Sequence, residues 1–433
     1  MIRWTAPALA AILGVALPAQ GPQTFRLDSG LECVLLESHE RPVIRMELET
    51  RWDRSELPAG KEGIAGLLAE ALASGGAGSY NRAAFNRALD ALGLKYAFKA
   101  RMGAYAWTLV ADSRAQEAAM ELLVDGVVRP AFDGPQVQSA RQALIRRAAA
   151  ESPRERATSR FLWSLADPAG LVPPGALGLD RIEHQDLLDF RRRVVRPEGS
   201  TLILYGDLNL TQAKQLALMH LGIWGPDAQA PVKAGPARAG AKAAPEPRLL
   251  AVFESGPGAE LWAGAPRPAD AGGPAVAALL PILLARASRS HFGALEMTFQ
   301  LPAQALAPLL IKAKVPLEDR DSLVPGFLAG LEALRSSGFS PEDLACALIQ
   351  WKAENGALAL HPEALVRAQA EGRLQPELAR AVAQVTLKEI DRALKAWLEP
   401  ERLRHLLLGA DAPMLQAAEK AGLTPSAILG PDA

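Results

Sequence analysis

The sequence predicts an α+β protein built from two homologous domains, and three observations carry this prediction. Apolar residues recur with the period of a strand in some segments and of a helix in others. Matching residue patterns return in the same order about 203 positions further along the chain. Between the two copies, residues 225–247 are dense in Ala, Pro and Gly and contain no aromatic residue, which is typical of a semi-extended linker. We therefore place one domain at 20–224 and the other at 248–433.

The first residues indicate an export signal. Arg3 precedes an apolar stretch rich in Ala and Leu over residues 5–17, which is too short to span a bilayer. Pro18-Ala19-Gln20 resembles a cleavage site after Ala19. We therefore expect residues 1–19 to be a signal peptide and the mature protein to be periplasmic or secreted. The alternative is an uncleaved membrane anchor. No other run of 18 apolar residues occurs, so we expect no membrane span once the leader is removed.

The strands of the first domain are predicted from alternation and turn residues. Ser29-Gly30 separates two short apolar runs, which favours a hairpin. Residues 42–52 alternate polar side chains with Ile44, Met46 and Leu48, as a half-buried strand does. The predicted strands are 25–28 and 31–37 in the hairpin, 42–52, a pair within 94–111 around Met102-Gly103, and 199–205.

The helices of the first domain are predicted from apolar residues spaced three and four positions apart. Thr211 is the expected N-cap of the last helix, because its hydroxyl can accept a hydrogen bond from a free backbone N–H. The predicted helices are 63–73, 82–92, 113–128, 136–151, 183–195 and 211–221. The second domain shows the same tail, a shorter front and a larger helical share.

The repeat rests on several matches at nearly one offset. Pro197-Glu198 recurs as Pro400-Glu401, and Gly206 recurs as Gly409, both 203 positions later. An apolar, strand-like run precedes each of these glycines. Ala143-Leu-Ile145 matches Ala347-Leu-Ile349 at an offset of 204. Ordered matches of this kind indicate a duplication.

Composition excludes several classes of protein. With 47 basic and 48 acidic residues among 433, the net charge is -1, so net charge gives no argument for nucleic-acid binding. Two cysteines cannot build a disulfide scaffold or a four-cysteine zinc site. We expect Cys33 and Cys346 to be buried free thiols, with a disulfide between the domains as the alternative. No nucleophile elbow, phosphate-binding loop or dinucleotide fingerprint occurs.

Short motifs along the first domain occur in a characteristic order. They are Leu27-Asp-Ser-Gly-Leu31, Gly63-Ile-Ala65, Gly75-Gly76, Leu92-Gly93, Arg129-Pro-Ala-Phe132 and Leu204-Tyr-Gly-Asp207. This series resembles the insulinase/pitrilysin zinc metallopeptidases, which include the mitochondrial processing peptidase subunits. The resemblance covers most of 24–224 and, more weakly, 248–422. It implies that each domain is an antiparallel β-sheet flanked by α-helices, the metallopeptidase LuxS/processing-peptidase-like fold, and that two such pairs form a chamber.

The same resemblance implies a degenerate zinc site. Active members carry His-x-x-Glu-His on the helix after the Gly-x-Ala turn, where the two His bind zinc and the Glu acts as general base. Here the first His position is Gly66, the general-base position is Ala69 and the second His position is Glu70. The third ligand, a Glu 77 residues further on, falls at Arg147, and Ala140 stands seven residues before it. The resemblance therefore implies no catalytic, metal-binding or cofactor-binding residue in this chain.

Other residues offer no clear replacement. The six histidines have no partner His three or four positions away; they are His39, His184, His220, His291, His361 and His405. Active members grip the substrate backbone with an Arg and a Tyr from the second domain. Residues 287–299 match that region only loosely, with Phe299 near the expected Tyr position. Arg147 either lies on a solvated helical face or pairs with Glu70 across the vacated site.

We therefore expect a non-catalytic homologue of these peptidases that pairs with a zinc-bearing homologous subunit to form a peptide-binding proteolytic chamber. The expected partners are that subunit and extended peptide, with no nucleic acid. We expect no cofactor in this chain, and zinc only in the catalytic partner. Two alternatives remain open: an active zinc metalloendopeptidase with a rearranged site, and a free-standing peptide- or protein-binding module.

Overall fold

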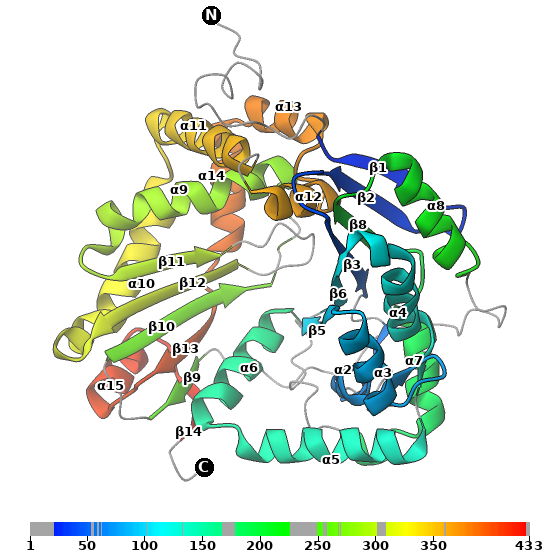
Figure 1. The fold of residues 1–433 in the computed structure, drawn as a ribbon. Helices are drawn as coiled ribbons and strands as arrows, with labels where there is room; N and C mark the ends of the chain where they lie inside the picture. The colour runs from blue at the N-terminus through cyan, green and yellow to red at the C-terminus, as the bar shows by residue number, and fades with distance from the viewer. Residues whose placement is uncertain are drawn as a thin grey trace, which may run out of the picture. The chain divides into compact units, whose positions relative to one another are not determined.

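The computed structural model shows two compact units, each built around one six-stranded sheet (Figure 1). Residues 21–429 are described except 53–55, 59, 62, 102, 132, 167–177, 226–248, 254–257, 267, 269, 301–308 and 359–360. The predicted signal peptide and all but the first residue of the predicted linker lie outside the described residues. Unit 1 comprises residues 1–149, 174–239 and 356–372, and unit 2 comprises 150–173, 240–355 and 373–433.

The sheet of unit 1 has the strand order β1-β2-β8-β3-β6-β5. Its strands are β1 (Gln23–Arg26), β2 (Glu32–Glu37), β3 (Val43–Arg51), β5 (Lys95–Arg101), β6 (Ala104–Asp112) and β8 (Ser200–Gly206). Neighbouring strands are antiparallel except β2 and β8, which are parallel. The sheet is therefore mixed, whereas an antiparallel sheet was expected. A small second sheet joins β4 (Gly76–Ala77) to β7 (Pro130–Ala131).

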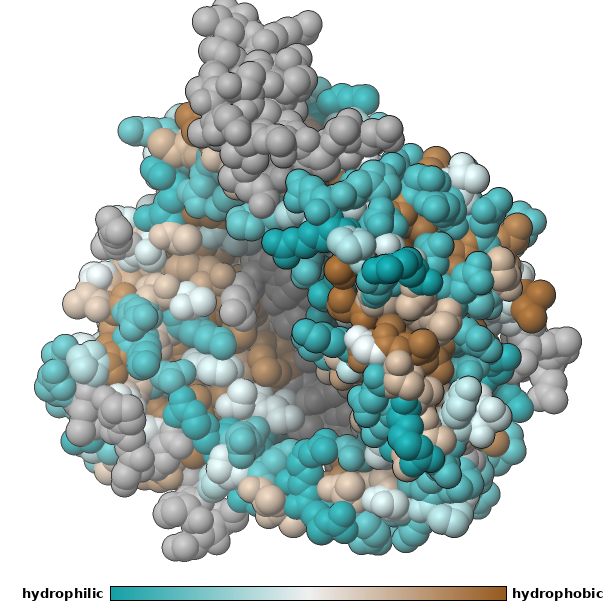
Figure 2. Space-filling model, in the orientation of Figure 1, coloured by the Kyte–Doolittle hydropathy of each residue, from teal (hydrophilic) through white to brown (hydrophobic). Residues whose placement is uncertain are grey.

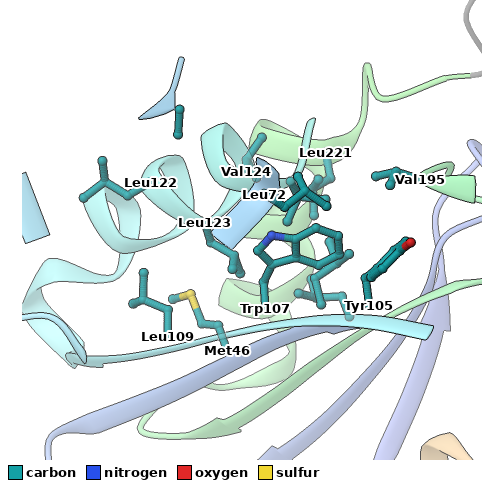
Figure 3. Close-up of a cluster of buried hydrophobic side chains, with 14 of the residues drawn as sticks. Met46, Leu72, Tyr105, Trp107, Leu109, Leu122, Leu123, Val124, Val195 and Leu221 are labelled. Atoms are coloured by element: carbon teal, nitrogen blue, oxygen red, sulfur yellow. The ribbon is translucent and has the colours of Figure 1, made fainter. Parts of the chain in front are cut away.

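The inner face of this sheet carries the core of unit 1. Helices α2 (Ile64–Ser74), α3 (Arg82–Ala91), α4 (Gln116–Val128), α5 (Gly134–Ala150), α7 (His184–Val194) and α8 (Leu210–Leu221) belong to this unit. The alternation predicted for β3 is confirmed, because Ile44, Met46 and Leu48 are fully buried. Figure 3 shows Tyr105 and Trp107 of β6 projecting into the same cluster, which therefore joins the sheet to its helices.

The outer face of the same sheet is covered in part by a helix from much later in the chain. Helix α12 (Pro362–Ala370) packs on β2 and β8. Its Val366 is buried against Val34, Leu36 and Ile203. The range predicted for the second domain included this helix, but its contacts place it in unit 1.

Unit 2 repeats the arrangement with the strand order β11-β12-β10-β13-β9-β14. Its strands are β9 (Leu249–Val252), β10 (Gly258–Ala265), β11 (Glu296–Gln300), β12 (Leu309–Pro316), β13 (Arg404–Leu408) and β14 (Pro425–Leu429). Its helices are α6 (Pro153–Ala166), α9 (Pro274–Phe292), α10 (Arg320–Ser337), α11 (Pro341–Ala357), α13 (Pro376–Gln384), α14 (Leu387–Trp397) and α15 (Ala412–Lys420). Helix α6 precedes the rest of the unit in the chain, and its Phe161 and Leu165 pack against Trp262 and Leu406 of the sheet. The range predicted for the first domain had included α6.

The duplication inferred from the sequence is visible in the elements. Helices α7 and α14 begin and end 203 residues apart, which is the predicted offset. Five strands keep the same order in both sheets, with β5, β6, β3, β8 and β2 corresponding to β11, β12, β10, β13 and β9. The sixth differs: β1 pairs antiparallel with β2, whereas β14 comes from the C-terminal end of the chain and pairs parallel with β9. A C-terminal strand thus takes the edge position that the shorter front leaves open.

One predicted helix cap is wrong and one helix was missed. Asn209, not Thr211, caps α8: its side chain accepts a hydrogen bond from the backbone N–H of Gln212, and the Gln212 side chain accepts one from the backbone N–H of Asn209. This reciprocal pair satisfies two N–H groups, which a cap at Thr211 would not. Helix α6 was not predicted. Within the described residues, no helix is both long and apolar enough to cross a membrane. Figure 2 shows hydrophilic residues spread over the visible surface, with hydrophobic residues in smaller areas between them.

Candidate functional site

Helix α2 holds the positions where active peptidases of the resembling family carry His-x-x-Glu-His. Gly66, Ala69 and Glu70 lie on its half-buried stripe, because positions three and four apart share one face of a helix. The opposite side is buried in the core of unit 1. The Tyr105 hydroxyl of β6 donates a hydrogen bond of 2.9 Å to the carbonyl oxygen of Ala65, which holds the start of α2 against the sheet.

Helix α5 brings the later positions to the same place. Ala140 is 1% exposed and Leu144 is 8% exposed, while Arg147 follows on the same face. A Cβ added to Gly66 would lie 3.4 Å from Leu144 Cδ2, so the two helices approach closely there. One turn further along, Arg147 Nη2 lies 2.9 Å from Glu70 Oε2. The structure therefore confirms the pairing of Arg147 with Glu70.

The side chains at this junction do not fit a zinc ion. Zinc sites need three or four nitrogen, sulfur or oxygen donors. Gly66, Ala69 and Ala140 offer none, and the carboxylate of Glu70 is occupied by a guanidinium that stays charged at any physiological pH. No general base stands at the Ala69 position. Across the described part of the chain, no group of three or more His, Cys, Asp or Glu could hold a metal ion.

The degenerate site lies beside a free sheet edge. Strand β5 is the end strand of the unit 1 sheet, and both α2 and α3 pack against it. Its inner face is aromatic: the Phe98 ring lies 5.2 Å from the ring of Trp107, measured between centroids. Its outer face carries exposed cationic side chains at Lys95, Lys99 and Arg101.

A buried ionic cluster on the outer face of β3 was missed by the sequence reasoning. Glu47 and Glu49 are 3% and 4% exposed. Arg367 of α12 donates hydrogen bonds of 2.5 and 2.7 Å to the two carboxylate oxygens of Glu47, and its Nη1 lies 3.6 Å from Glu49. Burial acts to lower the pKa of Arg367, but Glu47 and Glu49 outweigh it and raise that pKa above its ordinary value. The guanidinium thus stays charged.

Two further arginines share the second carboxylate of this cluster. Arg51 Nε lies 2.7 Å from Glu49 Oε1, and Arg101 Nη1 lies 3.5 Å from Glu49 Oε2. Next to Arg367, a cavity of about 30 Å³ has room for a water molecule but not for a substrate. The alternation of Arg and Glu along β3 is visible in the sequence. Arg367, however, is 320 residues from Glu47, and no spacing rule connects them.

The sequence matches no protein-family model and no curated protein. Solved structures do match its fold. A putative M16-like peptidase from Alicyclobacillus acidocaldarius aligns with 91% of this chain and 99% of its own, at 15% identity and a TM-score of 0.69. The peptidase M16 inactive domain from Pseudomonas fluorescens aligns with 91% of this chain and 98% of its own, at 17% identity and a TM-score of 0.64. This chain has the fold of the M16-type peptidases. The periplasmic protease PqqL from Escherichia coli shares that fold at 16% identity and a TM-score of 0.66, over 92% of this chain and 46% of its own.

Within the M16-type fold, the remaining residues of interest have structural surroundings. Phe299 lies on β11, and its ring packs 6.1 Å from the ring of Phe292, measured between centroids, so this position supplies no hydroxyl for a substrate. Cys33 and Cys346 are free thiols. Burial raises the pKa of the Cys33 thiol to about 12, so its reactive thiolate form is suppressed at neutral pH.

Proposed function

We propose that this chain is a non-catalytic relative of the M16-type peptidases that binds extended peptide and pairs with a zinc-bearing homologous subunit. The single observation behind the proposal is the junction of α2 and α5, where Arg147 and Glu70 form an ion pair in place of a ligand set. Hydrolysis through a metal-bound water needs an open metal site and a base. Gly66 and Ala69 remove one ligand and the base from this chain.

The size of the chain supports a paired assembly. Nearly all of it aligns with less than half of PqqL, a single longer chain. A protein of this length therefore corresponds to one half of such a molecule. We propose that the other half is a separate, zinc-bearing chain and that it supplies the hydrolytic chemistry.

Peptide binding rests on the edge strand β5. An end strand presents a row of backbone N–H and C=O groups, and an extended peptide can add to the sheet by pairing with them. Because α2 packs against β5, a peptide on this edge would lie next to the degenerate site. The predicted leader, together with the fold shared with periplasmic PqqL, supports export to the periplasm.

Metal analysis and affinity purification together test the proposal. The mature chain, residues 20–433, is purified and its zinc content measured, and hydrolysis of a fluorogenic peptide library is followed for the chain alone. We expect substoichiometric zinc and no hydrolysis that a chelator can inhibit. The tagged chain recovered from its native periplasm should bring down a homologous protein that contains His-x-x-Glu-His.

Two other outcomes would favour the alternatives. One zinc per chain, with hydrolysis that chelation abolishes, would identify an active enzyme with a rearranged site. Recovery of the chain alone and monomeric, with peptide still bound to it, would identify a free-standing binding module.

A further inference from the structure

Strand β5 places all its cations on one face of the sheet. Its register with β6 pairs Lys95 with Val110 and Arg101 with Ala104. Because side chains alternate along a strand, Lys95, Lys99 and Arg101 all project to the outer face. Each of the three is exposed. The outer face of this edge is therefore basic over almost its whole length.

The nearby acidic groups do not neutralise this edge. Glu49 is the carboxylate that Arg101 approaches, and Arg51 and Arg367 share it. Lys95 and Lys99 form no ion pair with any described residue. Positive charge on the edge is therefore in excess, although the whole chain has a net charge of -1.

The duplicated unit provides an internal comparison. Strand β11 holds the same end position in the sheet of unit 2, and its residues Glu296–Gln300 include no Lys or Arg. Glu296 pairs with Lys314 of the next strand, so the charge on that edge is acidic. The shared fold therefore does not require a basic edge, which is a property of unit 1.

The inner face of β5 favours apolar groups. Tyr96 and Phe98 project there and are half-buried, and Phe98 contacts the aromatic rings of Tyr105 and Trp107. Alternate side chains of an added strand would pack beside these rings. The two faces of the edge thus ask for different side chains: acidic on one and apolar on the other.

We propose that the β5 edge selects extended peptides with acidic residues on one face and apolar residues on the other. This inference rests on the proposed peptide-binding function and names its ligand class. In an antiparallel alignment, every second residue of the peptide faces Arg101, Lys99, Ala97 and Lys95 in turn. The preferred order at those positions is acidic, acidic, bulky and acidic, and a parallel alignment reverses it.

Fluorescence polarisation with labelled twelve-residue peptides tests the selection on the full mature chain. One peptide carries the acidic and apolar pattern, a second replaces each Glu with Lys, and a third carries the acidic pattern with alternate backbone nitrogens methylated. We expect the acidic peptide to bind at least about tenfold tighter than the basic one, and more weakly as salt rises. The methylated peptide should lose binding, because it cannot pair with the edge.

Charge reversal locates the site. K95E/K99E should weaken binding of the acidic peptide about tenfold and strengthen that of the basic peptide. The control K352E/K388E changes the net charge equally at two exposed lysines of unit 2 and should change neither affinity. Circular dichroism shows whether both variants stay folded.

The outcomes separate the two proposals. If no peptide binds, the lysines only protect the edge from pairing, and the peptide-binding function fails as well. If all peptides bind equally and K95E/K99E has no effect, the acidic selection is wrong while peptide binding stands. An equal loss in the control variant would mean non-specific attraction and would overturn the assignment of the site.

Discussion

Arg367 compensates two buried carboxylates, so its removal should destabilise unit 1. In the Arg367→Ala variant, Glu47 loses both of its short hydrogen bonds, and its nearest remaining cation is Arg45, whose Nη2 lies 3.7 Å away. Glu49 keeps Arg51 at 2.7 Å. The main consequence is therefore an uncompensated charge at Glu47, which is only 3% exposed.

The expected loss is about 2 to 3 kcal/mol in the free energy of unfolding. Breaking a fully buried ion pair by removing one partner costs about 3 to 5 kcal/mol. The Arg367 side chain is 28% exposed, so solvent already screens part of this interaction and the lower value applies. Val366 is the only side chain of α12 in the buried cluster on this face, so few apolar contacts can offset the loss.

Urea denaturation measures the loss, and hydrogen exchange of residues 362–370 shows whether α12 detaches. The matched control is Arg380→Ala, because Arg380 and its partner Glu377 are 73% and 71% exposed; it should cost at most about 0.5 kcal/mol. Adding Glu47→Gln to Arg367→Ala should recover part of the stability, because the double variant no longer buries a lone charge. Equal costs for Arg367→Ala and Arg380→Ala would refute this reasoning.

Three further predictions follow from the site and its surroundings. Restoring the family's zinc pattern should give one zinc per chain by elemental analysis, whereas Arg147→Glu alone should give none; the substitutions are G66H, A69E, E70H and R147E. In native protein Cys33 should react with a thiol reagent far more slowly than Cys346, and denaturation should remove the difference; fast native labelling of Cys33 would contradict its burial. Hydrogen bonds from Asp207 and Glu37 raise the pKa of His39 above 6.5, so Asp207→Asn should lower it, as measured by NMR titration. The stabilisation from this histidine is present below pH 6.5 and is lost as the pH rises through the raised pKa, so stability that grew over that interval would contradict the assignment.

Much of the fold could be predicted because its signals are local or repeated. The alternation in β3 needs only nine residues, and the helices α7 and α14 follow from one pattern seen twice. Helix α6 carried such a signal too, since Ala157, Phe161 and Leu165 are buried at positions four apart. Its assignment to unit 2 carried none, because nothing near it in the sequence names the sheet that it covers.

The charged cluster shows where sequence reasoning stops. Glu47 and Glu49 occupy the polar positions of an alternating strand, and most such positions are solvated. Their burial depends on α12, which the chain reaches more than 300 residues later. A contact of this kind follows from tertiary packing, and neither propensity nor spacing predicts it.

The Glu70–Arg147 pair and the β5 edge indicate how this fold can lose its chemistry and keep its ligand. A zinc site requires several donors and a base at once, so the loss of Gly66 and Ala69 as functional positions is enough to end hydrolysis. The ion pair needs only two side chains to bridge α2 and α5, and at 2.9 Å it does so. Peptide pairing uses backbone groups of β5 that none of these substitutions touches. Selection on such a chain can therefore act on the side chains of the edge, and the basic face present on β5 and absent from β11 is the difference expected from it.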